Sequence, residues 1–200
     1  MTPPDPTHDH RDHGDPPGSL SAAVHCLRQG GVLAYPTEAV WGLGCDPFNE
    51  AAVRRLLALK QRSVDKGLIL VAAQAAQLTG LVDWDALPPA RREAVLATWP
   101  GPHTWLIPAT ARVPRWITGS HDSVALRVSA HPIVSALCAG FGAPLVSTSA
   151  NSSGAPPPHT RHDLDPDLIG ALDAIVDGDT SGLDRPTPIR DARSGAALRP

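Results

Sequence analysis

The stretch GLILVAA, residues 67–73, is apolar throughout after its glycine. It has the length of a β-strand, and an apolar run without polar alternation is typical of a strand that is covered on both faces. The residues before it, NEAAVRRLLALK (49–60), carry apolar side chains at helical spacing behind Asn49, a residue type favoured at helix N-caps. A helix followed by a covered strand predicts an α/β fold.

The same alternation continues in both directions along the chain. Ser19 and a Gly-Gly pair bracket a predicted helix, and Gly142 ends another. Further helices are predicted over 19–31, 88–99 and 131–142, strands over 32–36, 103–109, 122–129, 143–151 and 171–179, and a hairpin over 187–200. Because some strands follow each other directly, we expect one twisted sheet of mixed parallel and antiparallel strands with helices packed on it.

Charge and proline divide the chain into two parts. Residues 1–18 contain five prolines, four aspartates and one arginine, and we predict a disordered Pro/His/Asp-rich tail. Residues 19–200 are then the folded domain, and they are close to neutral because the tail carries the net charge of −3. A neutral domain excludes a polybasic, histone-like binder.

The cysteines and the hydropathy indicate the compartment. Cys26, Cys45 and Cys138 are far apart and form no CxxC pair, which fits a reducing cytoplasm. No apolar run reaches the roughly 18 residues that a membrane span needs, so we expect no membrane partner. No metal-ligand pattern is present either.

Two polar segments follow predicted strands. AYPTEAVWGLGCD (34–46) runs from a strand into a glycine-rich bend, and PLVSTSANSSG (144–154) runs from a strand into Ser, Thr and Asn. Loops at strand ends bind ligands in α/β folds, and hydroxyl, amide and backbone N–H groups can line an anion pocket. Both segments also suit ordinary turns and caps, so neither decides the function alone.

The two lysines of the chain, Lys60 and Lys66, stand close together with Arg62 between them. One cation at a helix C-terminus is explained by the helix dipole. Three cations at the mouth of a strand are better explained by a polyphosphate, which Arg holds through two parallel bonds and Lys holds as a point charge.

These segments together resemble the YrdC-like family. YPTEAVWGLG is similar to its threonine-side loop, LKQR to its KxR motif and STSAN to its SxN motif, and PGPHTWLIPA and SVALRVSAHP resemble its intervening strands in the same order. The match covers residues 20–155 and loosens after them, and KQRSVDKGLIL is particularly similar to the short, single-domain bacterial branch. The resemblance implies a twisted mixed sheet around a large concave cavity.

It also implies an enzyme. Members of that branch make threonylcarbamoyl-AMP and pyrophosphate from L-threonine, bicarbonate or CO₂, and ATP, with Mg²⁺ carried by the ATP. A partner complex then transfers the threonylcarbamoyl group to adenosine 37 of tRNAs that read ANN codons. The second domain of the longer branch is absent from this sequence.

The resemblance assigns roles residue by residue. Lys60 and Arg62 are expected to hold the triphosphate and to be catalytic, and Lys66 to lie on the phosphate or the threonine side. The remaining expected contacts are Thr37, Arg127, Ser147 and Thr187 for threonine, and Ser123, Ser149, Asn151 and Arg199 for ATP. TPIRD departs from the family's usual Ser-Thr-Val-Val-Asp, so Thr187 and Arg199 rest on position alone.

Three alternatives stay open at this point. Arg127 could be a structural arginine that joins two strands. The chain could be a carbamoyl-adenylate-forming carbamoyltransferase domain, although those usually adjoin zinc-finger modules with CxxC pairs. It could also be a non-catalytic tRNA or double-stranded RNA-binding module that uses the five arginines between residues 91 and 127.

Overall fold

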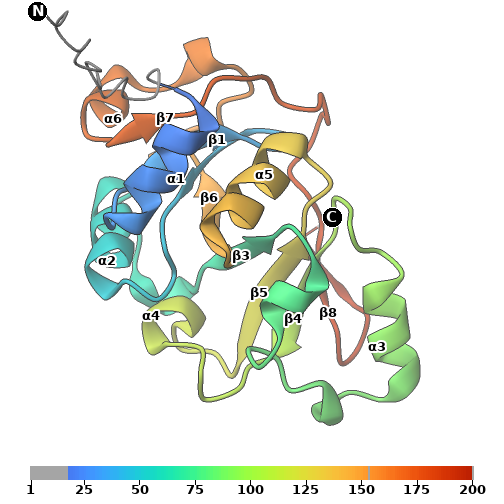
Figure 1. Ribbon diagram of the computed structural model, residues 1–200. Coiled ribbons are helices and arrows are strands. Elements are labelled where there is room, and N and C mark those ends of the chain that lie inside the picture. The colour runs from blue at the N-terminus through green and yellow to red at the C-terminus, as the bar shows by residue number, and fades with distance from the viewer. Residues whose placement is uncertain (1–17, 153, 200) are drawn as a thin grey trace, which may run out of the picture.

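The computed structural model describes residues 18–152 and 154–199 (Figure 1). Within them a nine-stranded sheet has the order β7-β1-β2-β6-β3-β5-β4-β8-β9. The strands are β1 (Leu33–Pro36), β2 (Trp41–Gly44), β3 (Ile69–Ala72), β4 (Thr104–Pro108), β5 (Ser123–Val128), β6 (Leu145–Ser149), β7 (Ala174–Ile175), β8 (Ile189–Asp191) and β9 (Ala197–Arg199). The predicted tail lies outside the described residues except for Gly18.

The sheet is mixed, as the sequence predicts. β3 pairs with β5, β1 with β7, and β4 with β8 in parallel, and the other neighbouring pairs are antiparallel. β8 and β9 form the hairpin expected at the end of the chain.

The longer helices begin and end where their caps indicate. Ser19 caps α1 (Leu20–Arg28) and Asn49 caps α2 (Glu50–Leu59), each by accepting a hydrogen bond from a backbone N–H of the first turn. α5 (Pro132–Phe141) ends at Gly142, which has the left-handed φ of 87° that glycine adopts freely. α3 (Pro89–Leu96) completes the predicted set.

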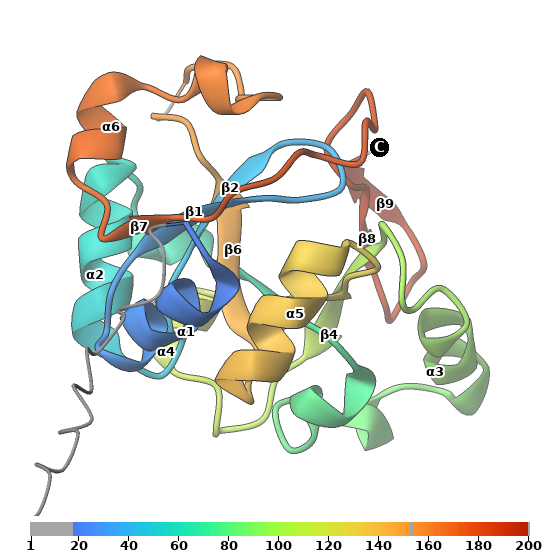
Figure 2. The same ribbon diagram turned by 45° about the horizontal axis from the view of Figure 1, so that its top comes forward.

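Helices cover both faces of the sheet because the strand side chains alternate. Leu33, Tyr35, Val71 and Leu145 point to one face and pack against α1 and α5, which lie side by side there (Figure 2). Their chain neighbours Ala34, Leu70 and Val146 point to the opposite face and belong to the larger core with Val53 and Leu56 of α2. Near the middle of the sheet, the first face also carries the candidate site.

The expectation of a glycine-rich bend after β1 was wrong in part. A tight turn follows β1, but Trp41–Gly44 is β2, paired with both β1 and β6. A Cβ on Gly44 would lie 2.6 Å from the Val146 carbonyl oxygen and 2.7 Å from Tyr35 Cε1. Gly44 therefore permits close packing within a central strand rather than a bend.

Several short elements have no clear signal in the sequence. They are the helices α4 (Arg115–Thr118) and α6 (Pro166–Gly170) and the 3₁₀ turns η1 (Val64–Lys66), η2 (Ala75–Leu78), η3 (Trp84–Ala86) and η4 (Arg161–Asp163). No helix among the described residues has both the length and the apolar character needed to span a membrane.

Candidate active site

A cavity of about 530 Å³ opens over the centre of the sheet. Its floor includes one row of residues in register across four adjacent strands: Ser147 of β6, Ile69 of β3, Ala125 of β5 and Leu106 of β4. Gly42 of β2 extends this floor and lies opposite Ser149 of β6. The side chains of the floor are thus small or apolar, and most polar groups of the cavity come from the strand ends and loops around it.

The turn between β1 and β2 forms one wall. Thr37 donates a hydrogen bond from Oγ1 to the Val40 carbonyl oxygen at 2.7 Å, and its backbone N–H donates to the same oxygen at 3.1 Å. These bonds close the turn and fix the Thr37 hydroxyl at the cavity surface. Gly42 keeps this corner open, since a Cβ there would lie 3.3 Å from Thr37 Cγ2 and 3.6 Å from Ser147 Oγ.

The segment after α2 turns sharply between its two cationic side chains. Gln61 has a φ of 50°, in the left-handed region that non-glycine residues seldom occupy. Its N–H donates to the Ala58 carbonyl, and the Arg62 N–H donates to the Leu57 carbonyl, both at 3.0 Å. This is a Schellman motif with glutamine in place of the usual glycine. Because of this turn, the side chains of Lys60 and Arg62 point in different directions.

Lys60 is buried and fastens the turn after β6. Its Nζ donates to the carbonyl oxygens of Ser149, at 2.5 Å, and Asn151, at 2.6 Å, with Asn151 Oδ1 at 3.4 Å. Lys60 is not among the cavity-lining residues. Burial, and then the nearby charge of Arg62, lower the pKa of Lys60 to about 8. Lys60 thus reaches the turn from behind the cavity wall.

Arg62 and Lys66 face the cavity itself. Arg62 is half-buried and donates from Nη2 to the Gly67 carbonyl at 3.0 Å, while its Nε is buried without a hydrogen-bond partner. Burial lowers the pKa of Arg62. Lys66 ends the 3₁₀ turn η1 and is exposed. The segment after α2 therefore contributes two cations to the cavity wall.

The Ser149–Asn151 turn forms another part of the cavity wall. Ser149 donates from Oγ to Asn151 Oδ1, and Asn151 Nδ2 donates to the Ala155 carbonyl, both at 2.5 Å. The Ala150 N–H donates to the Trp41 carbonyl at 2.8 Å, which ties the turn to β2. The turn is held from below by β2 and from behind by Lys60.

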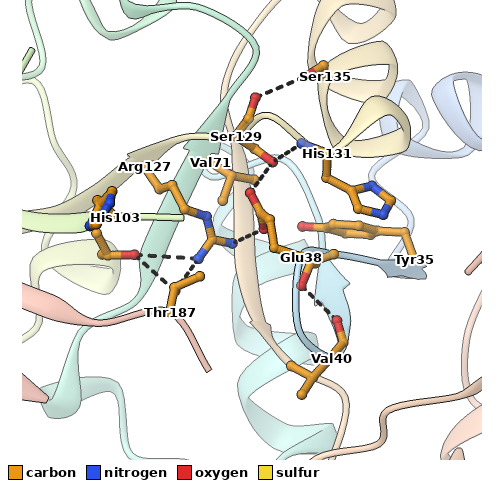
Figure 3. A network of polar contacts seen from close by, with 12 residues as sticks. Tyr35, Glu38, Val40, Val71, His103, Arg127, Ser129, His131, Ser135 and Thr187 are labelled. Atoms are coloured by element: carbon orange, nitrogen blue, oxygen red, sulfur yellow. Dashed lines mark hydrogen bonds and ion pairs between the residues drawn. The ribbon is translucent and has the colours of Figure 1, made fainter. Parts of the chain in front are cut away.

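Arg127 of β5 reaches the cavity from a buried polar network (Figure 3). Its Nη1 donates to Thr187 Oγ1 at 2.6 Å and lies 3.4 Å from Thr104 Oγ1, and its Nη2 is 3.5 Å from Glu38 Oε2. Its Nε is buried without a hydrogen-bond partner. Arg127 therefore joins three separate parts of the fold and also lines the cavity.

Thr187 connects Arg127 to the end of the chain. Arg199 of β9 donates from Nη2 to the Thr187 carbonyl at 2.7 Å. Burial, and then the charge of Arg127, lower the pKa of Arg199, so the two guanidiniums are electrostatically coupled. Both line the cavity.

The charge of the cavity has one sign. Arg62, Lys66, Arg127 and Arg199 are in its walls, and within residues 18–152 and 154–199 the walls contain no aspartate or glutamate. Four cations without a carboxylate among the wall residues favour a polyanionic ligand, and the hydroxyl and amide groups of the walls can supply its remaining hydrogen bonds.

A family model, Sua5/YciO/YrdC, described as telomere recombination, matches residues 25–200. The chain belongs to this family. It is 63% identical over 180 residues to a threonylcarbamoyl-AMP synthase of Xanthomonas euvesicatoria, covering 90% of this chain and 96% of that relative. The YrdC-like resemblance of the sequence is confirmed.

Solved structures of the family have the same fold. A P. abyssi Sua5 complexed with L-threonine is 35% identical with a TM-score of 0.80, over 86% of this chain and 50% of that one. E. coli YciO is 24% identical with a TM-score of 0.75, over 92% of this chain and 91% of YciO, a likeness in fold alone. The predicted fold class is confirmed.

All but one of the site residues expected from the family resemblance lie around the one cavity. Thr37, Arg62, Lys66, Ser123, Arg127, Ser147, Ser149, Asn151, Thr187 and Arg199 line it. Lys60 differs, because its ammonium binds the backbone of the Ser149–Asn151 turn. Arg127 combines both sequence readings, since it joins structural elements and also faces the cavity.

Three polar residues of the site had no role in the sequence prediction. Glu38 and Ser129 support Arg127 from behind, and Thr104 lies beside its Nη1. Thr104 and Ser129 stand at the two ends of predicted strands, at 103–109 and 122–129, and Glu38 lies inside the quoted YPTE segment. Their position at or just beyond the end of an apolar strand was the feature of the sequence that could have identified them as site residues.

Proposed function

We propose that this chain is a threonylcarbamoyl-AMP synthase. It uses L-threonine, bicarbonate or CO₂, and ATP, and it releases pyrophosphate. The observation that carries the proposal is the convergence of four cations and a Ser/Thr/Asn turn on one cavity of about 530 Å³. That volume lies within the range of about 300–1,000 Å³ in which proteins bind small molecules and nucleotides. The names of the relatives that match nearly end to end support it.

In this proposal the amino acid occupies the corner formed by Thr37, Ser147, Arg127 and Thr187. The Arg127 guanidinium suits an α-carboxylate, and the hydroxyls of Thr37 and Ser147 can bind the amine and the side-chain hydroxyl. The P. abyssi relative with L-threonine bound supports an amino acid as the ligand of this fold.

ATP occupies the rest of the cavity. Arg62 and Lys66 hold the phosphates, the Ser149–Asn151 turn and Ser123 bind the nucleotide, and Arg199 reaches ATP from its place beside Thr187. Lys60 acts on ATP through the turn that it fastens. This assignment keeps every expected residue but gives Lys60 an indirect role.

Mg²⁺, in this proposal, arrives with ATP as part of the substrate. The described residues contain no cluster of three potential metal ligands, and their cavity walls lack carboxylates, so phosphate oxygens supply its coordination. The ion offsets phosphate charge beside Arg62 and Lys66.

The chemistry then needs positioning more than acid–base groups. The threonine amine adds to CO₂, derived from bicarbonate, and the resulting carbamate releases one proton. A carbamate oxygen attacks the α-phosphorus while the bond from that phosphorus to the bridging oxygen breaks, and pyrophosphate leaves. Arg62 and Lys66 neutralise the leaving pyrophosphate, which is the main requirement of such a transfer.

We place the reaction in the cytoplasm, upstream of the complex that modifies adenosine 37 of tRNAs reading ANN codons. The product is a reactive mixed anhydride, so a transferase must consume it soon after release.

Mass spectrometry of a single mixture tests the proposal. Purified protein with ATP, bicarbonate and L-threonine is expected to yield threonylcarbamoyl adenylate together with an equal amount of pyrophosphate. Omitting bicarbonate and replacing threonine by serine are the controls. ATP consumption without the adenylate, or equal product with serine, would contradict the assignment.

A further inference from the structure

Glu38 is a buried carboxylate that lies directly behind the cavity wall. Its neighbours Thr37 and Ala39 line the cavity, but Glu38 does not. Its side chain turns inward, where Oε1 accepts a hydrogen bond from Ser129 Oγ at 2.6 Å (Figure 3). Ser129 Oγ in turn accepts from the His131 N–H at 3.1 Å, at the start of α5. Glu38 is therefore held in one place.

The other oxygen of Glu38 serves Arg127. Oε2 is 3.5 Å from Arg127 Nη2 and has no hydrogen-bond partner. This spacing compensates the charge of the guanidinium without fully occupying its donor. Thr187 and Thr104 hold Nη1 on the other side, so the guanidinium is fixed between two hydroxyls and one carboxylate.

Without Glu38, two arginines would stand beside Thr187, and the cavity walls formed by the described residues would offer no carboxylate to offset them. Arg127 and Arg199 both donate to Thr187, one to its hydroxyl and the other to its carbonyl. Arg127 is buried and Arg199 is exposed beside it, so the pair would attract phosphates, because the buried charge of Arg127 is poorly screened. A polyphosphate could then bind at either end of the cavity.

We propose that Glu38 is a positioning and specificity-determining residue: it orients Arg127 for an α-carboxylate and offsets its charge, so that this corner accepts a zwitterionic amino acid and rejects polyphosphate. The inference rests on the proposed function and deepens it. A zwitterion has no net charge and loses little to Glu38, since its ammonium offsets its carboxylate. A phosphate chain meets the full repulsion of the Glu38 carboxylate.

Glu38→Gln tests the inference, because it keeps the shape and removes the charge. Threonine binding is measured at equilibrium without ATP, alone and with added pyrophosphate. We expect the Kd for threonine to rise by about tenfold or more, the scale for breaking a buried charge pair. Pyrophosphate is expected to compete with threonine in E38Q and to leave threonine binding within twofold in the wild type. Direct titration should also show tighter pyrophosphate binding to E38Q.

Two further variants separate charge from position and from folding. Ser129→Ala removes the bond that holds Glu38 but keeps its charge, so threonine should bind several-fold more weakly while pyrophosphate still fails to compete. Glu50→Gln, on the exposed face of α2 where Glu50 pairs with Arg54, is the matched control and should behave as wild type. S129A also carries the test if E38Q does not fold.

An unchanged threonine Kd in E38Q, or the absence of pyrophosphate competition in it, overturns the inference, as does wild-type threonine binding in S129A. If the wild type forms threonylcarbamoyl adenylate and E38Q binds threonine and pyrophosphate as the wild type does, this inference fails and the proposed function stands. Wild-type protein that binds no threonine contradicts the proposed function as well.

Discussion

Replacing Lys60 by methionine separates two roles that the sequence leaves together. Lys60 Nζ donates to the carbonyl oxygens of Ser149 and Asn151 at 2.5 and 2.6 Å, and methionine has a similar length but no donor. The change therefore releases the turn that faces the cavity while leaving the lining cations in place. We expect turnover to fall by about 10²-fold, the scale on which preorganised groups act at reacting centres.

Stability should fall much less than activity. Hydrogen bonds from a charged donor contribute about 1.5–3 kcal/mol each, so the two short bonds represent about 3–6 kcal/mol. Against this, burial and Arg62 lower the pKa of Lys60 from 10.5 to about 8, a cost of about 3 kcal/mol for the ammonium, which methionine avoids. The net loss is about 0–3 kcal/mol, or a Tm decrease below about 12 °C for a domain of this size.

Equilibrium binding of ATP and AMP decides between the two roles. If Lys60 orders the turn that binds the nucleotide, Lys60→Met weakens ATP and AMP by the same factor. If Lys60 instead holds the outer phosphates, ATP weakens and AMP does not, and the present reasoning is refuted. Lys66→Met is the matched control, because Lys66 lines the cavity and its loss should affect ATP more than AMP.

Three other predictions concern pH, Arg62 and the glycines of β2. Between pH 7 and 9 the Lys60 ammonium deprotonates, so ATP affinity should fall in wild type and stay level in K60M. Between about pH 8 and 10.5, Lys60 is protonated in the unfolded chain and mostly neutral in the folded protein. Denaturant titrations should therefore show the contribution of Lys60 to the free energy of unfolding rising with pH in this range. Arg62→Ala should weaken ATP by about tenfold or more in calorimetry, with threonine within twofold, because a lost charge-assisted bond to phosphate costs about 1.5–3 kcal/mol; an equal loss for both ligands would place Arg62 elsewhere. Gly44→Ala should lower the free energy of unfolding by about 1–3 kcal/mol, because its Cβ would overlap the Val146 carbonyl and Tyr35. Gly42→Ala should keep the wild-type melting temperature and raise the KM for threonine. Equal melting temperatures for the two variants would contradict the packing described for Gly44.

The sequence predicted those parts of the fold whose signals are local. Ser19, Asn49 and Gly142 mark helix ends by their own chemistry, and the apolar run at 67–73 marks a central strand by its composition. β2 was not predicted, because two of the four residues in Trp41–Gly44 are glycines. These glycines are needed for close contacts with residues about 100 positions away or on a neighbouring strand. Strand pairing of this kind has no trace within a short window.

The candidate site divides in the same way. Cationic and hydroxyl side chains that face a ligand are recognisable by type, so the residues lining the cavity were identified from a family pattern. The contacts of Lys60 were not predicted, because its partners are backbone carbonyls 89 and 91 residues further along the chain, and backbone acceptors have no residue type to recognise. Glu38 had no predicted role, because its partners Ser129 and Arg127 are distant in the sequence.

The turn at Gln61 explains why one short motif performs two tasks. An uninterrupted helix would place Lys60 and Arg62 about 200° apart around its axis, since each residue advances the helix by about 100°. The left-handed Gln61, with a φ of 50°, ends α2 instead, so that Lys60 remains on the helix end behind the wall and Arg62 begins the loop in front of it. Holding a non-glycine residue there costs of order 1 kcal/mol, and that cost persists only where surrounding contacts fix the conformation. The two Schellman hydrogen bonds, together with Lys60 on the Ser149–Asn151 turn, are those contacts. The contact between α2 and β6 through Lys60 and the cavity-facing position of Arg62 therefore depend on the same turn, and loosening either one should disturb the other.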